Sequence, residues 1–152
     1  MASDQIVSTG LRMESFHRLR SIVRYWGPVW LYAALIFGGS SVSTPPEVIA
    51  SVLKEISDKL LHLCEYGILG VLSYRACRHA AGPWVARHAV MTAVVGSALY
   101  GLTDEVHQLY VPFRQADPFD LIADMAGALL GAWIWRRLEQ RALSRPLLRP
   151  GA

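Results

Sequence analysis

The sequence predicts an all-α fold, an integral membrane four-helix transmembrane bundle with both termini cytoplasmic. Three observations predict it: an apolar composition, four long apolar stretches, and a regular alternation of basic residues between the segments that connect them. The 152 residues are 53% hydrophobic and 18% charged, with a mean hydropathy of +0.28. Soluble domains carry about a quarter charged residues. The composition therefore disfavours an ordinary soluble enzyme, and it excludes an intrinsically disordered chain.

The four apolar stretches are the predicted helices, in chain order. The first has no charge and the others have few; they run over residues 26–42, 60–74, 85–103 and 121–135. A bilayer core needs about 20 residues, so the shorter stretches reach that length only where the helix continues into its polar flanks. Because proline removes a backbone donor and fixes φ, we expect the connections at the proline-containing segments 44–46, 82–83 and 112–118.

The basic residues alternate between the connecting segments. In chain order the five segments hold four, two, three, one and five Lys or Arg residues. Basic residues of short loops stay in the cytoplasm, so the termini and the loop around Arg78 are predicted inside, and the loops around Lys54 and Arg114 outside. The net charge of +3 is then a topology signal, and no nucleic-acid partner is expected. The predicted parts are a basic N-terminal segment, a transmembrane domain and a basic tail: 1–25, 26–138 and 139–152.

Two other interpretations compete with this one. The first stretch could be a signal peptide with Ser41-Val42-Ser43 as its small-residue cleavage site, although the segment before it is longer than a typical n-region. The chain could also be a soluble bundle of very apolar helices, but such a bundle has no reason to sort arginine into alternate loops.

Polar residues cluster at the ends of the second, third and fourth stretches, which the predicted topology places in the outer half of the membrane. Ionisable groups in a membrane are costly and normally face the interior of the bundle. We therefore expect an outward-facing cavity lined by Lys59, His62, Glu65, Asp104, Glu105, His107, Gln108, Arg114, Asp120 and Asp124. Because burial disfavours the charged form, a basic side chain or a histidine should contact Glu65 or Asp124, which lie deepest.

Some of these residues also have simpler interpretations. Lys59 could be an interface anchor, and Asp120 could be the N-cap of the fourth helix. Gly127 and Gly131 form a Gly-x-x-x-Gly pattern, which lets helices pack closely; packing within this chain is preferred over a homodimer.

The polar pieces, taken in order, resemble the VanZ-like family of small bacterial integral membrane proteins. The matching pieces are Lys59-x-x-His62-x-x-Glu65-Tyr66, Tyr100-x-x-x-Asp104-Glu105-x-His107-Gln108, Pro112-x-Arg114 and Asp120-x-x-x-Asp124-x-x-Gly127-x-x-x-Gly131. The sequence departs from the family pattern at Asp124, where many members have Asn, and at Asp117, where a small Ser-like residue is common. The resemblance implies a multi-pass protein of the bacterial inner membrane. The name-giving member is associated with low-level resistance to teicoplanin-type glycopeptides, which does not supply a reaction.

Three functions are compatible with such a cavity. The preferred one is a protein that binds a lipid headgroup or a cell-wall precursor and modulates the envelope, with Lys59 and Arg114 on phosphate. The second alternative, a small transporter or proton relay, would use the same carboxylates. The first alternative is a membrane hydrolase or transferase acting on a lipid-linked phosphate. Its candidate ligands for a divalent ion are His62, Glu65, Asp104, His107 and Asp120. No known metal or nucleophile motif is present, so catalysis, any cofactor and the oligomeric state stay open.

Overall fold

The computed structural model describes residues 2–42, 51–112 and 117–144. In these ranges the chain forms five helices and no strand: α1 (Ala2–Ser40), α2 (Ser51–Ala80), α3 (Pro83–Arg87), α4 (Ala89–Gln108) and α5 (Pro118–Ser144). The predicted all-α class is therefore confirmed. Among the helices described, none is both long enough and apolar enough to cross a membrane.

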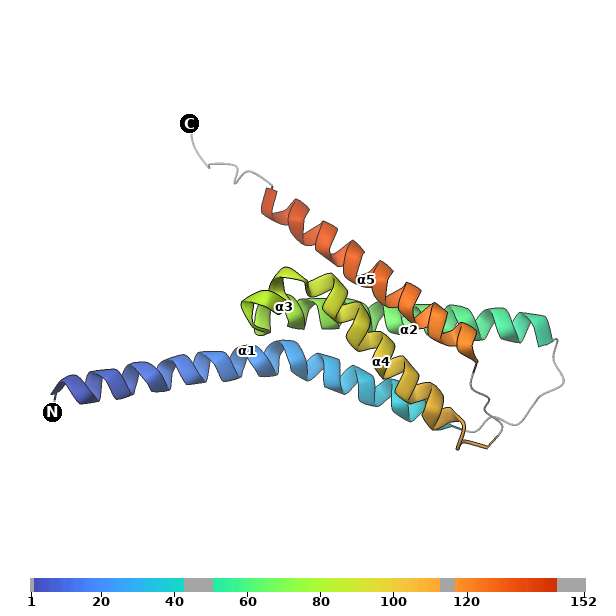
Figure 1. Cartoon of the computed structure of the whole chain (residues 1–152), viewed down its shortest axis with the longest axis horizontal. Coiled ribbons are helices and arrows are strands. Elements are labelled where there is room, and N and C mark those ends of the chain that lie inside the picture. Colours follow the sequence, from blue (N-terminus) through green and yellow to red (C-terminus); the bar gives the residue numbers. More distant parts are fainter. Residues whose placement is uncertain (1, 43–50, 113–116, 145–152) are drawn as a thin grey trace, which may run out of the picture.

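The four long helices alternate in direction along the chain (Figure 1). Helices α1 and α4 run one way and α2 and α5 run the other way, so the start of α1 and the end of α5 lie toward the end of the bundle that also holds α3. Helix α2 packs against α1, α4 and α5, and α5 also packs against α4. The up-and-down order is the one that the four apolar stretches predict.

Proline marks the helix boundaries more precisely than hydropathy does. Pro83 and Pro118 are the first residues of α3 and α5, where the missing N–H costs nothing because that group would have no helical partner.

Pro28 instead lies inside α1, and Figure 1 shows this helix changing direction near its middle. A proline inside a helix removes one hydrogen bond and bends it.

The third apolar stretch is not one helix, and that expectation was wrong. The backbone leaves helical geometry at His88, with φ −106° and ψ 26°, and its N–H bonds to the carbonyls of Trp84 and Val85. A short helix, α3, therefore precedes α4.

Helices α2 and α5 approach each other so closely that only glycine fits at several positions. A Cβ added at Gly127 would overlap the carbonyl of Leu63, and one at Gly131 would overlap the carbonyl of Gly67. On the opposite side of the contact, a Cβ at Gly70 would overlap the backbone of Ala128. The Gly-x-x-x-Gly pattern thus serves packing within the chain, as predicted.

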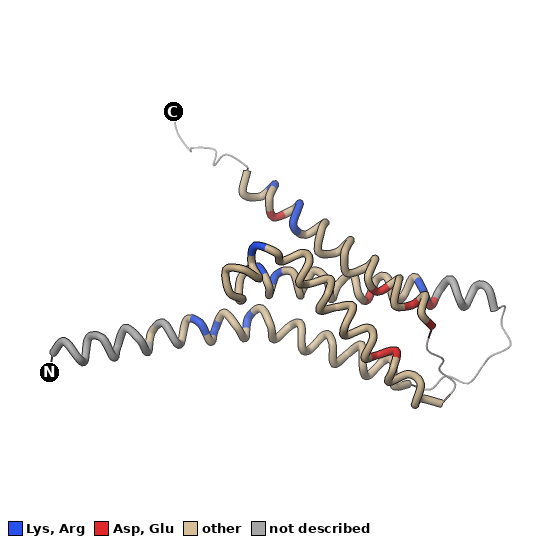
Figure 2. The backbone as a smooth tube through the Cα atoms, viewed as in Figure 1, with Lys and Arg blue, Asp and Glu red and all other residues tan. Residues whose placement is uncertain are grey.

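Charge is segregated along the bundle (Figure 2). In the described part, most arginines lie toward the end that holds α3, whereas most aspartates and glutamates lie toward the other end. Lys59 is a cation at the acidic end, where it pairs with Asp117, and Glu139 is a carboxylate at the basic end, where it contacts His79. The bundle is therefore electrically polar from end to end.

Candidate functional site

Most of the buried polar side chains gather at the acidic end, where α1 and α4 end and α2 and α5 begin. The buried members of this cluster are Ser40, His62, Asp104, Glu105, Gln108, Asp120 and Asp124. Burying a polar group costs free energy unless it finds a partner, and burying a charge costs more. The partners of each side chain therefore determine what the cluster can do.

His62 on α2 joins the cluster to α5. Its Nδ1 lies 3.0 Å from Asp124 Oδ1, and its Nε2 lies 4.0 Å from Asp120 Oδ2. The prediction that a basic group or histidine contacts one of the two deepest carboxylates is thus confirmed for Asp124, which is 1% exposed. The other oxygen of Asp124, Oδ2, has no hydrogen-bond partner among the described residues, and a Cβ added at Gly101 would lie 2.7 Å from it.

Lys59 and Asp117 form the outer edge of the cluster. Lys59 Nζ lies 2.8 Å from Asp117 Oδ2 and 3.5 Å from Asp120 Oδ1. The hydrogen bond to Asp117 raises the pKa of Lys59. The same bond lowers the pKa of Asp117, and the backbone N–H of Phe119, which donates to Asp117 Oδ1 over 2.9 Å, lowers that pKa further. Asp117, rather than Asp120, therefore acts as the N-terminal cap of α5.

Glu105 on α4 is 6% exposed and completes a group of possible metal ligands. Its Oε2 accepts a hydrogen bond of 2.9 Å from the backbone N–H of Asp117, while its Oε1 is buried without a partner among the described residues. His62, Glu105 and Asp120 each offer one ligand atom, and the three atoms lie within 4.8 Å of one another. The sequence nominated His62 and Asp120 as metal ligands but not Glu105.

Asp104 faces α1 instead. Its Oδ1 accepts a hydrogen bond of 2.6 Å from Ser40 Oγ, and its Oδ2 accepts one of 3.2 Å from Gln108 Nε2. These residues border a cavity of about 120 Å³ whose full lining is Ile36, Gly39, Ser40, Leu61, His62, Glu65, Asp104 and Gln108. Four residues that the sequence proposed thus line one cavity between α1, α2 and α4. Sequence reasoning missed Ser40, because a serine at the end of an apolar run carries no distinctive signal.

One described site residue of the predicted set, His107, is not brought into this group. His107 lies on another side of α4, where its Nε2 is 3.0 Å from Ser41 Oγ and its ring stacks on Phe37 with centroids 4.3 Å apart. Arg114 lies outside the described residues. The remaining members of the predicted set all lie at the acidic end.

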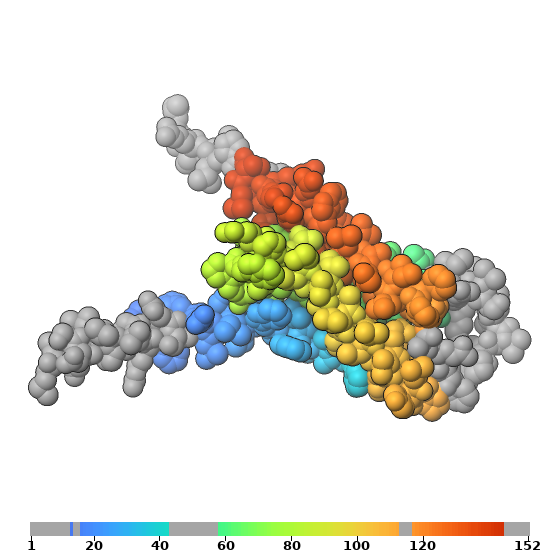
Figure 3. Space-filling model, in the orientation of Figure 1, coloured from blue at the N-terminus to red at the C-terminus, as the bar shows by residue number. Residues whose placement is uncertain are grey.

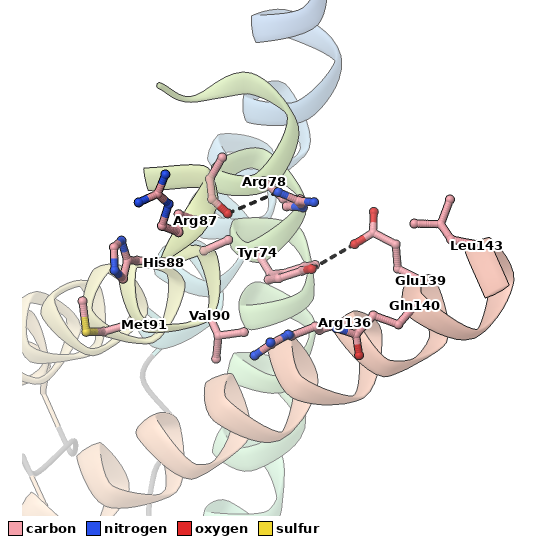
Figure 4. A pocket seen from close by; sticks show the side chains of 12 residues that line it. Tyr74, Arg78, Arg87, His88, Val90, Met91, Arg136, Glu139, Gln140 and Leu143 are labelled. Carbon is pink, nitrogen blue, oxygen red and sulfur yellow. Dashed lines mark hydrogen bonds between the residues drawn. The ribbon is translucent and has the colours of Figure 1, made fainter. Parts of the chain in front are cut away.

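A second cavity, of about 470 Å³, lies at the opposite, basic end (Figure 4). Its lining includes Arg78, Arg87 and Arg136, and none of the ten predicted site residues. Its carboxylate, Glu139, accepts a hydrogen bond of 2.9 Å from Tyr74 and lies 2.8 Å from His79 Nε2. These contacts join α2 to α5, which favours a structural role for Glu139.

The fold and the site together define a helical bundle with a histidine-carboxylate cluster buried at one end. A family model described as VanZ/LLP1 matches residues 3–139. The chain therefore belongs to the VanZ/LLP1 family, and the match extends the resemblance across α1. No curated protein and no solved structure is similar enough to the chain to count as a match.

Proposed function

We propose that this protein is a multi-pass protein of the bacterial cytoplasmic membrane. Its buried polar cluster would open to the outer side and bind a lipid headgroup or a cell-wall precursor, and so modulate the envelope. The observation that carries the proposal is the distribution of polarity. Charged side chains are buried between the helices, whereas large apolar side chains cover the outside.

The apolar surface is extensive. On α1, Trp30 is 70% exposed and Leu31 66%, and α4 and α5 expose further large side chains, including Leu99 and Trp133. Figure 3 shows atoms of α1, α4 and α5 on the same face of the molecule. Soluble monomers rarely expose apolar patches of such extent, whereas lipid tails would solvate them at no cost. The buried carboxylates of α4 and α5, such as Glu105 and Asp124, lower the average hydropathy of these two helices without facing lipid.

The charge segregation supports the orientation. Arginine-rich ends remain in the cytoplasm, which would turn the acidic end and its cavity toward the outer surface. Lipid headgroups and cell-wall precursors are found on that side. The association of the name-giving family member with teicoplanin-type resistance also supports a role in the envelope.

The size of the cavity bears on what it can bind. About 120 Å³ accommodates a headgroup-sized fragment and is well below the 300–1,000 Å³ typical of sites that enclose drug-sized ligands. The rest of a larger ligand would extend outward from the end of the bundle.

A complementation experiment tests this function. Asp104→Asn keeps the size of the side chain and the acceptor for Ser40 but removes the charge. In a strain that lacks the protein, we expect this variant to reach wild-type levels in the membrane fraction and to fail in restoring wild-type teicoplanin susceptibility and envelope integrity. Glu139→Gln, at the basic end, is the matched control and should complement. Full complementation by Asp104→Asn, or recovery of wild-type protein outside the membrane fraction, would contradict the proposal.

A further inference from the structure

We propose that His62, Glu105 and Asp120 bind one divalent transition-metal ion at the acidic end of the bundle. The three residues come from α2, α4 and α5, so the ion would connect three helices. This site does not depend on the envelope function proposed above. It rests on the positions of three buried side chains and on one unsatisfied oxygen.

The first argument is geometric. The three ligand atoms lie within 4.8 Å of one another, and His62 Nε2 is 4.0 Å from Asp120 Oδ2. A separation of 4.0 Å is too long for a hydrogen bond. Two ligand atoms of a tetrahedral ion with bonds of about 2.0–2.2 Å lie about 3.3–3.6 Å apart, so side-chain movements on the order of 1 Å would bring the group to coordination distances.

The second argument is the unsatisfied oxygen. Only 6% of the surface of Glu105 is exposed, and its Oε1 has no hydrogen-bond partner in the described part of the chain. A buried carboxylate oxygen without a partner is strongly unfavourable. Since Oε2 already accepts the N–H of Asp117, an ion at the centre of the group would satisfy the remaining oxygen.

The third argument concerns the orientation of His62. Asp124 Oδ1 lies 3.0 Å from His62 Nδ1, so a proton on Nδ1 would be held there and the lone pair would be on Nε2, which faces Asp120. A carboxylate that fixes the far side of a ligating imidazole is a recurrent feature of metal sites. The two oxygens of Asp120 also have different partners: Oδ1 faces Lys59 and Oδ2 faces His62.

The donor set selects the kind of ion. One imidazole nitrogen and two carboxylates suit Zn²⁺ or Mn²⁺ better than Ca²⁺ or Mg²⁺, which prefer oxygen alone. Three protein ligands also leave coordination positions for an external oxygen. If the proposed envelope function holds, a phosphate oxygen would occupy such a position, and a cation would explain how an acidic cluster attracts an anionic headgroup. Only this last step rests on the proposed function.

The test is metal analysis of the purified full-length chain. The protein is stripped with a chelator, equilibrated separately with Zn²⁺ and with Mn²⁺, and washed. We expect it to retain about one ion per chain of at least one of the two metals, and to gain thermal stability on binding. Glu105→Gln should lose this stoichiometric binding, and because its amide oxygen can still accept the Asp117 N–H, it should remain folded. Asp124→Asn should weaken binding by about 10–100-fold.

His107→Ala is the matched control. It removes a histidine at the same end of the bundle that lies outside the group of three, so its ion content should equal that of the wild type. The site is overturned if wild-type protein retains neither ion, or if Glu105→Gln binds as well as wild type. Because metal content is measured without lipid or antibiotic, such a result would be independent of the complementation experiment.

Discussion

Asp117 has two roles at the start of α5. One carboxylate oxygen caps the helix through the N–H of Phe119, and the other pairs with Lys59. The backbone N–H of Asp117 also donates to Glu105, so this one residue links the N-terminal part of α2, the C-terminal part of α4 and the start of α5. A small residue at this position would provide neither the charge nor the pairing.

The pairing predicts a pH dependence. Lys59 lowers the pKa of Asp117 below its ordinary value of 3.8, so we expect Lys59→Met to raise that pKa in an NMR titration. The stability contributed by a depressed carboxyl pKa is present above the pKa of the unfolded state and is lost as the pH falls through the folded pKa. The difference in stability between wild type and Lys59→Met should therefore shrink on acidification below about pH 4.

Lys59→Arg is the control for this prediction, because it keeps the positive charge. Its Asp117 pKa should stay below the ordinary value. If the pKa of Asp117 is unchanged in Lys59→Met, the hydrogen bond from the N–H of Phe119, and not Lys59, lowers this pKa.

The sequence predicted which residues gather at the acidic end, but not which atoms meet. Residues four apart on a helix share a face, and Asp104 and Gln108 are hydrogen-bonded. Spacing alone does not say which neighbouring helix each face meets. For that reason Glu105 was not nominated as a metal ligand, and His107, which faces Ser41 and Phe37, was. Asp117 was identified only as a departure from the family pattern, because its contacts arise from tertiary packing.

At the scale of elements, the contact between α2 and α5 dominates the fold. Gly127→Ala would place a Cβ against the carbonyl of Leu63, and that backbone atom cannot move aside. We expect the two helices to separate and the protein to lose about 1–3 kcal/mol of stability, the usual cost of overpacking. The midpoint of thermal unfolding in detergent measures this loss.

The control for this prediction is Gly96→Ala in α4, where an added Cβ meets nothing within 4 Å. Alanine is the better helix former and restricts the unfolded chain more, so this variant should be neutral or more stable by up to about 1 kcal/mol. Equal losses in the two variants would contradict the close-packing argument.

Hydropathy did not predict the helix boundary at His88, which separates α3 from α4. The run of residues 85–103 is apolar throughout most of its length and contains no proline, so it predicts one helix. The structure separates α3 from α4 because the N–H of His88 closes the last turn of α3. No local signal in the sequence distinguishes that turn from a continuing helix. The alternation of helix directions, in contrast, followed from the number of apolar stretches and was predicted correctly.

At the scale of the whole molecule, the two ends of the bundle differ in both charge and chemistry. The basic end holds the start of α1, the end of α5 and the cavity bordered by Arg78, Arg87 and Arg136. The acidic end carries the proposed ligand and metal site. In a bilayer this polarity would determine the orientation, because arginine is retained in the cytoplasm far more strongly than carboxylates are.

The orientation can be tested with reporter fusions at the two ends. A fusion after Arg78, between α2 and α3, should report a cytoplasmic location, and a fusion after Pro112, between α4 and α5, should report an external one. Replacing Arg78 and Arg87 by Gln removes two positive charges from the segment that connects α2 to α4. Some molecules should then insert with the opposite orientation, and the cytoplasmic signal of the fusion after Arg78 should fall. The same two substitutions leave the residues of the acidic cluster unchanged. An external signal after Arg78 in the wild-type protein would reverse the orientation, and the acidic cavity would then face the cytoplasm, where it could not meet an external headgroup or cell-wall precursor.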